Sequence, residues 1–170
     1  MTDRKSNFND VQAFHDKFGI SDHCPDAPQN LPKHLVKFRL AFLLEELSEF
    51  ARAQGALATA LRLNVIAHDL HTMRDEKFQE HHINTVDAFD ALLDLSVVTL
   101  GTADMMGLPW EAGWDIVHER NMAKVRANAD GSNSKRRSPY DIVKPPGWYG
   151  PEKALTELLA THMHRAGGDE

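Results

Sequence analysis

Helix-period spacing of apolar side chains is the feature that most constrains this chain. Apolar residues recur three and four positions apart along much of the sequence, and no alternating run of Val, Ile or Thr is flanked by a tight-turn dipeptide. Glycine and proline divide this pattern into segments, so the sequence predicts an all-α fold. The expected helices cover residues 8–18, 33–54, 85–106, 109–127 and 152–164. A weaker pattern predicts further helix within 56–83, with a loop around His81 and His82.

Two segments near the C-terminal end are expected to lie outside helices. Residues 128–138 are polar and basic, a composition that predicts a flexible loop. Residues 141–150 are rich in proline and glycine, which predicts an extended segment docked by Trp148 and Tyr149. The whole stretch 128–150 is therefore a candidate lid.

Composition and charge exclude several classes of protein. The 170 residues include 25 Asp+Glu and 19 Lys+Arg, a formal net charge of −6, which argues against a nucleic-acid binder. Cys24 is the only cysteine, so an intrachain disulfide is excluded and a reducing compartment is favoured. No apolar run approaches the roughly 20 residues of a membrane span, and the N-terminus lacks the apolar core of a signal peptide. We therefore expect one cytoplasmic domain over residues 1–170, ending in a helical segment over 151–166, with no membrane or nucleic-acid partner.

A group of glutamates marks the first long helix. Glu45, Glu46 and Glu49 lie on one face, within about 100° of helix rotation. The expected core-facing stripe lies elsewhere around the helix and consists of Val36, Leu40, Leu43, Leu47 and Phe50. Phe38 and Phe42 continue the acidic face toward the N-terminus, and a solvated face would not carry two phenylalanines. We therefore expect both faces to be covered, with the carboxylates bordering an apolar cavity or a subunit interface.

The helix predicted over 85–106 repeats this arrangement. Asp87, Asp90 and Asp94 lie within about 60° of one another, and most other positions are apolar, so the helix is expected to be buried. Ionised carboxylates are costly to bury without compensation, and this helix contains no lysine. A divalent cation would compensate them, and oxygen-only donors favour Mg²⁺ or Mn²⁺.

Other interpretations of the acidic residues are weaker. Either acidic face alone is compatible with a solvated helix surface, but the two together in one small all-α chain favour a metal site. A di-iron carboxylate centre would need two Glu-x-x-His motifs, which the sequence lacks. Four histidines could also bind a metal, but we expect them to form a solvated polar linker: His68, His71, His81 and His82.

Four stretches of the chain resemble one known superfamily. They are RLAFLLEELSEF, DALLDLSVVTLGTADMMG, HERNMAKVRA and DIVKPPGW. These stretches are similar to the all-α NTP pyrophosphohydrolases, which include MazG-like proteins, phosphoribosyl-ATP pyrophosphohydrolase and the MazG-like dUTP pyrophosphatases. The resemblance covers roughly residues 14–148.

The superfamily signature is Glu-Glu-x-x-Glu followed by Glu-x-x-Asp. Residues 45–49 match its first half, and Asp94 matches its final aspartate. The second half departs from the signature, because Ala91 stands where an acidic residue is expected. Asp90 lies one position earlier and is the obvious substitute, with Asp87 as the alternative.

The resemblance implies magnesium-dependent hydrolysis of a nucleoside triphosphate to the monophosphate and pyrophosphate, by a homo-oligomer of at least two chains. No nucleophile–histidine arrangement and no Gly-x-x-x-x-Gly-Lys loop is readable, which agrees with a metal-activated water. Glu46, Glu49 and Asp94 are the implied metal ligands, joined by Asp90. Glu45 is either a further ligand or the base that takes the water's proton, and Glu45 and Glu46 are the candidate catalytic residues.

Five further residues are candidates for substrate binding. Asn121 and Lys124 match an Asn-x-x-Lys pattern of the superfamily, where they would contact phosphate. Arg39 and Lys144 could also pair with phosphate, and Phe42 could border the base. Each of the last three has a plainer interpretation, namely an ion pair, a surface lysine and a core side chain. Two other functions stay open, phosphoribosyl-ATP pyrophosphohydrolase and a non-catalytic helical module that binds a nucleotide.

Overall fold

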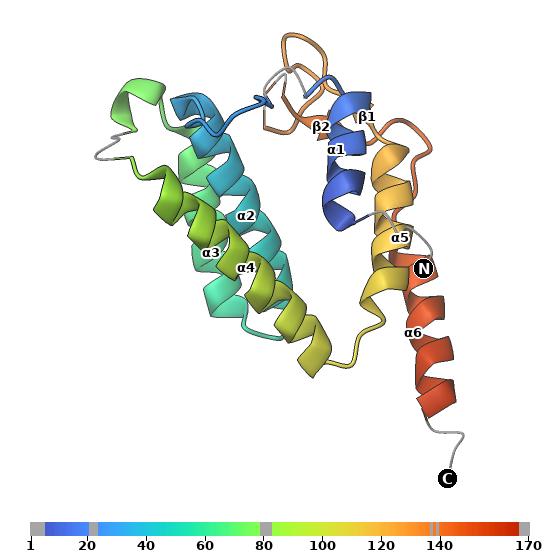
Figure 1. Cartoon of the computed structure of the whole chain (residues 1–170). Helices are drawn as coiled ribbons and strands as arrows, with labels where there is room; N and C mark the ends of the chain where they lie inside the picture. Colours follow the sequence, from blue (N-terminus) through green and yellow to red (C-terminus); the bar gives the residue numbers. More distant parts are fainter. Residues whose placement is uncertain (1–5, 21–23, 79–82, 137, 139, 167–170) are drawn as a thin grey trace. The chain divides into compact units, whose positions relative to one another are not determined.

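The computed structural model describes residues 6–20, 24–78, 83–136, 138 and 140–166 (Figure 1). Within these residues the fold is all-α, as predicted, apart from one short β-hairpin. The helices are α1 (Asn7–Lys17), α2 (Lys33–Ala53), α3 (Leu57–Thr72), α4 (Thr85–Met105), α5 (Trp110–Met122) and α6 (Glu152–Ala166). The other elements are a 3-10 turn η2 (Asp75–Lys77) and the strands β1 (Val125–Arg126) and β2 (Ile142–Val143). The loop predicted around His81 and His82 lies outside the described residues.

Most helix boundaries agree with the predicted ones because the sequence contains clear stop signals. Gly55 after α2 and Gly107 after α4 have φ values of 79° and 64°. This left-handed region strongly favours glycine and ends a helix. At the start of α1, the Asn9 amide donates to Ser6 Oγ at 3.3 Å and caps the helix.

Helices α2 and α3 form a hairpin within one compact unit, Ala27–Ala88. The buried residues of the two helices are mostly small. They include Ala41, Ser48, Ala51, Ala60 and Ala67. The Ser48 hydroxyl donates to the Ala60 carbonyl at 2.9 Å, so its buried polar atom is satisfied at the helix contact.

The core-facing stripe predicted for α2 is wrong within this chain. The four large side chains Leu40, Leu43, Leu47 and Phe50 are between 41% and 50% exposed. The face of α2 that is buried against α3 is instead the small-residue face, because small side chains allow two helix axes to approach closely. Hydrophobicity alone could not reveal this, since the spacing of apolar residues does not report side-chain volume.

A buried lysine joins α2 to the segment that follows α3. Lys37 Nζ donates to the Met73 carbonyl at 2.5 Å and lies 2.5 Å from Asp75 Oδ1. The Lys37 side chain is only 10% exposed. Its hydrogen bond and its positive charge lower the pKa of the Asp75 carboxyl below the ordinary value of 3.8. The pair therefore ties the second turn of α2 to η2.

The second unit, Met1–Asp26 with Phe89–Glu170, is organised around α5. Helices α1 and α6 both pack on α5. The Trp114 indole donates from Nε1 to Asp10 Oδ2 at 2.9 Å, and His118 Nε2 lies 3.9 Å from Asp10 Oδ1. Phe18, directly after α1, is 5% exposed. The first predicted helix is therefore an integral part of this unit.

The helix predicted over 109–127 is too long and is corrected by the structure. Helix α5 ends at Met122, and the next residues form β1, which pairs antiparallel with β2. Val125 is opposite Val143 in this register, and Arg126 is opposite Ile142. Two-residue strands leave no alternating pattern long enough to recognise, which explains why the sequence did not predict them.

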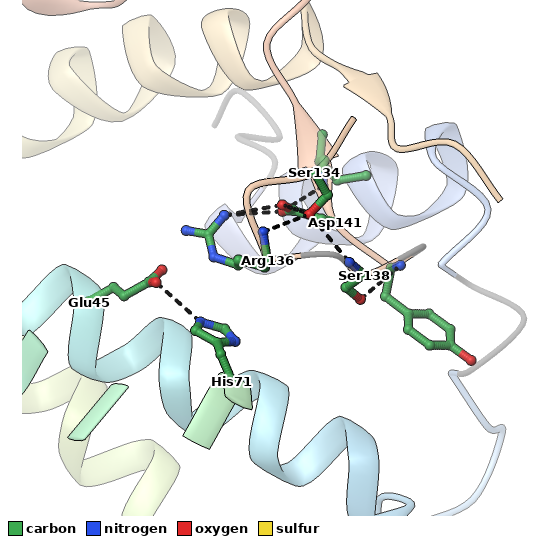
Figure 2. Close-up of polar contacts among 8 residues, drawn as sticks. Glu45, His71, Ser134, Arg136, Ser138 and Asp141 are labelled. Atoms are coloured by element: carbon green, nitrogen blue, oxygen red, sulfur yellow. Dashed lines mark hydrogen bonds and ion pairs between the residues drawn. The ribbon is translucent and has the colours of Figure 1, made fainter. Parts of the chain in front are cut away.

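Several described residues of the segment predicted as a loop meet at a buried carboxylate. The Asp141 side chain is almost fully buried, with 3% of the residue exposed. Its Oδ2 accepts from Ser134 Oγ at 2.7 Å and from Arg136 Nη1 at 3.2 Å (Figure 2). Ser134 Oγ in turn accepts from the Arg136 amide at 3.0 Å. One buried carboxylate thus organises the loop's described residues.

Helix α4 differs from the buried helix that was predicted. Phe89, Val97 and Met105 are 62%, 67% and 90% exposed, and Ala103 is the only buried residue of α4. No helix among the described residues is by itself long and apolar enough to cross a membrane. Only together are α4 and α5 long and apolar enough by length and composition, and the chain bends by 118° at the break between them.

Candidate functional site

The predicted metal ligands lie on α2 and on the part of α4 that follows the boundary between the two units at residues 88 and 89. On α2, Glu45 is half-buried while Glu46 and Glu49 are exposed. On α4, Asp90 and Asp94 are both exposed. Among the described residues, no three Asp, Glu, His or Cys side chains are grouped as a metal site would require. The five-residue ligand set therefore stays a prediction.

The donor chemistry of these residues nevertheless suits a hard divalent cation. All five side chains offer carboxylate oxygen, the donor type that Mg²⁺ and Mn²⁺ prefer. Four of the five are exposed and therefore accessible to a hydrated ion. The exception is Glu45, whose side chain is 25% exposed.

Glu45 is paired with a histidine that was expected to lie in a solvated linker. His71 Nε2 lies 3.1 Å from Glu45 Oε1, and the imidazole is only 12% exposed (Figure 2). The prediction that His71 belongs to a solvated linker is therefore wrong, whereas His68 is exposed as expected. On the buried face of α3, Ala67 lies seven residues after Ala60, and His71 lies four residues after Ala67. That spacing is the signal that could have identified it.

The two phenylalanines on the acidic face of α2 contact each other and this histidine. Phe38 and Phe42 meet edge to face with centroids 4.5 Å apart. Their rings also lie 6.0 Å and 6.3 Å from the His71 ring. This packing explains why phenylalanine occurs beside the glutamates. Phe42, the candidate for the base pocket, is thus part of the wall around the Glu45–His71 pair.

In the second unit, the structure brings together two predicted phosphate-binding lysines around one indole. Lys144 Nζ lies 4.6 Å from the centroid of the Trp148 ring, and Lys124 Nζ lies 5.7 Å from it. Trp148 Nε1 donates to the Arg120 carbonyl at 3.0 Å, near the end of α5. The docking role predicted for Trp148 is therefore confirmed, whereas Tyr149 is 69% exposed. We call Lys124, Lys144 and Trp148 the lysine–tryptophan cluster.

Arg120 adds a third cation next to this cluster. Its guanidinium carbon lies 4.5 Å from the centroid of the Tyr149 ring, and its side chain also pairs with Glu119. Desolvation acts to lower the pKa of the Arg120 guanidinium, but hydrogen bonds with Tyr149 and Glu119 outweigh it and raise that pKa. Arg120 therefore stays charged. Arg120 lies in the stretch HERNMAKVRA, and no role was predicted for it.

Two other predicted residues have different surroundings. Asn121, three positions before Lys124, is half-buried at the end of α5. Arg39 is exposed on α2 and belongs to the other unit. A phosphate role for Arg39 stays a prediction.

The side chains described above offer two kinds of chemistry, and each unit is taken by itself. The α2 face offers carboxylates, one of them fixed by an imidazole, and such groups can bind a cation or accept a proton. The lysine–tryptophan cluster offers positive charge for phosphate oxygens. Enzymes that transfer phosphoryl groups use both kinds of group.

One family of known proteins matches this chain. The family model for phosphoribosyl-ATP pyrophosphohydrolase matches residues 11–121, well over half of the sequence. The matched region contains both acidic helices and ends at Asn121, so the lysine–tryptophan cluster lies beyond it. Neither the curated proteins nor the solved structures gave a match.

Proposed function

Because the chain belongs to the phosphoribosyl-ATP pyrophosphohydrolase family, part of the MazG-like all-α superfamily, we propose that it hydrolyses a nucleoside triphosphate to the monophosphate and pyrophosphate. The family makes the chain a nucleotide pyrophosphohydrolase. The observation that carries the finer proposal is the family match over the two helices that hold Glu45, Glu46, Glu49 and Asp94.

In this proposal the carboxylates share out two tasks. Glu46, Glu49 and Asp94 would hold Mg²⁺ or Mn²⁺, with Asp90 in place of the acidic residue missing at position 91. Such an ion neutralises phosphate charge and lowers the pKa of a bound water. Glu45 either completes this ligand set or accepts the proton of the attacking water, and the second role suits the one glutamate of the three that is half-buried.

The cations act on the phosphate chain. Lys124 and Lys144 would pair with phosphate oxygens, and the approach of both ammonium groups to Trp148 supports a shared role. Water adds to a phosphorus atom, the bond between the α- and β-phosphates breaks, and pyrophosphate leaves with the charge that the lysines offset. Asn121 would add a side-chain amide to the same oxygens.

Phosphoribosyl-ATP is a second candidate substrate, and the description of the matching family favours it. It is itself a triphosphate and would use the same carboxylates and the same leaving group. Phosphoribosyl-ATP differs from ATP by a phosphoribosyl group on the adenine, which adds a second sugar and a further charged phosphate.

A substrate panel tests the proposal. Pyrophosphate release should be measured with the eight common ribo- and deoxyribonucleoside triphosphates and with phosphoribosyl-ATP, each with Mg²⁺. Hydrolysis of one or more common triphosphates supports the proposal. Hydrolysis of phosphoribosyl-ATP alone would replace it with the second candidate, and binding without turnover would make the chain a nucleotide-binding module.

A further inference from the structure

The Glu45–His71 pair is built into the contact between α2 and α3. His71 lies on the face of α3 that also carries the buried residues Ala60 and Ala67, so its imidazole points into the helix contact. A polar ring at such a place needs a hydrogen-bond partner. Glu45 Oε1, at 3.1 Å from Nε2, provides one.

Aromatic packing limits the movement of the imidazole. Phe38 and Phe42 face the His71 ring at steep interplanar angles of 68° and 82°. Both rings come from α2, one and two turns before Glu45. The imidazole is therefore held by two rings and one carboxylate from α2. Because the imidazole is packed in this way, it in turn restricts the Glu45 carboxylate.

The three glutamates of the acidic face therefore differ in burial and in their contacts. Glu46 and Glu49 are exposed, whereas Glu45 is half-buried and paired with a ring that is itself packed. A carboxylate that must receive a proton or bind an ion at one position gains from being oriented in advance.

We infer that His71 is a positioning residue, whose imidazole fixes the Glu45 carboxylate in the orientation that the reaction uses. The inference rests on the proposed function, because it assigns Glu45 a part in hydrolysis. It assigns His71 no contact with substrate and no proton transfer.

The experiment compares three variants. His71→Ala removes the imidazole, His71→Gln keeps a side-chain N–H near the position of Nε2, and His68→Ala is the control from the exposed face of the same helix. The measurements are kcat and KM for the best triphosphate, Mn²⁺ affinity without nucleotide, and the melting temperature.

We expect His71→Ala to lower kcat or Mn²⁺ affinity by about tenfold or more, the usual effect of losing a group that orients a ligand. KM should change little, because the substrate does not contact the imidazole. His71→Gln should recover most of the loss, and His68→Ala should behave as the unmodified protein. In a Glu45→Gln background, His71→Ala should have no further effect on kcat.

Two outcomes would overturn the inference. The first is a His71→Ala protein that melts at a lower temperature but keeps both kcat and Mn²⁺ affinity, since the imidazole would then only pack. The second is a His71→Gln protein that folds but recovers neither quantity. If the unmodified chain hydrolyses no triphosphate, the proposed function fails, and Mn²⁺ affinity of the same variants still decides whether His71 positions Glu45.

Discussion

At the scale of single residues, the site is best described by the contact between Glu45 and His71, whose side-chain atoms Oε1 and Nε2 lie 3.1 Å apart. Helix geometry was enough to group Glu45, Glu46 and Glu49, because their relation depends only on rotation about one axis. The histidine comes from a second helix, 26 residues away, and its role depends on how the two helices pack. Without knowledge of that packing, His71 was predicted to be exposed to solvent.

Charge removal at the exposed carboxylates gives the first prediction. Glu49→Gln and Asp94→Asn keep the side-chain shape, and each should lower kcat by orders of magnitude because a ligand charge is lost. The helical circular dichroism should be unchanged, since these residues are exposed. Asp104→Asn, elsewhere on α4, is the control and should retain full activity. Near-normal turnover by Asp94→Asn would refute the proposed ligand set.

The departure at Ala91 leads to a graded prediction on α4. Asp90 lies about 40° to one side of Asp94 around the helix, and Ala91 about 60° to the other. Aspartate is also shorter than the glutamate expected at position 91, so Asp90 reaches less far. Asp94→Ala should therefore raise the Mg²⁺ concentration for half-maximal rate most, Asp90→Ala less, and Asp87→Ala least. If Asp87→Ala proves the most damaging, the substitute ligand lies one turn earlier.

At the scale of elements, the sequence predicted what depends on local signals. Gly55 and Gly107 mark the ends of α2 and α4 because a left-handed residue is a local requirement. The hairpin of β1 and β2 was missed because pairing Val125 with Val143 is a non-local event. The face of α2 that packs on α3 was misjudged because volume, rather than hydrophobicity, selects it.

The ion pair between α2 and η2 gives a pH prediction. Lys37 lowers the pKa of Asp75, so the folded state favours the ionised carboxyl. This contribution to stability is present above the ordinary value of 3.8 and is lost as the pH falls through the lower folded-state pKa. Asp75→Asn should therefore melt at a lower temperature than the unmodified chain at pH 7, and the difference should disappear in strong acid. A difference independent of pH would show that the pair's charge is not responsible. The exposed neighbour Glu76, changed to Gln, is the control.

At the scale of the whole molecule, large apolar side chains remain exposed in the isolated chain. They lie on α2, α3 and α4, for example Leu47, Leu61 and Leu92 at 50%, 59% and 55% exposure. Monomeric proteins rarely leave so much apolar surface uncovered. We therefore propose a homo-oligomer, the state that the superfamily resemblance implies.

Sedimentation tests this proposal. The unmodified chain should sediment as at least two copies of its 19.1 kDa mass. Leu47→Glu should shift the distribution toward the monomer, because it places a charge on the exposed stripe of α2, whereas Gln54→Glu beyond the end of α2 should not. A monomeric unmodified chain at micromolar concentration would contradict the proposal.

Metal-dependent pyrophosphate release tests the central claim most directly. The purified chain should be freed of metal with EDTA, and pyrophosphate release from the triphosphate panel should then be measured before and after Mg²⁺ is added back. The account predicts no release from the EDTA-treated protein, recovery with Mg²⁺ or Mn²⁺, and a melting temperature that rises with either ion, because the folded carboxylates bind it. Full pyrophosphate release by the EDTA-treated protein would contradict it.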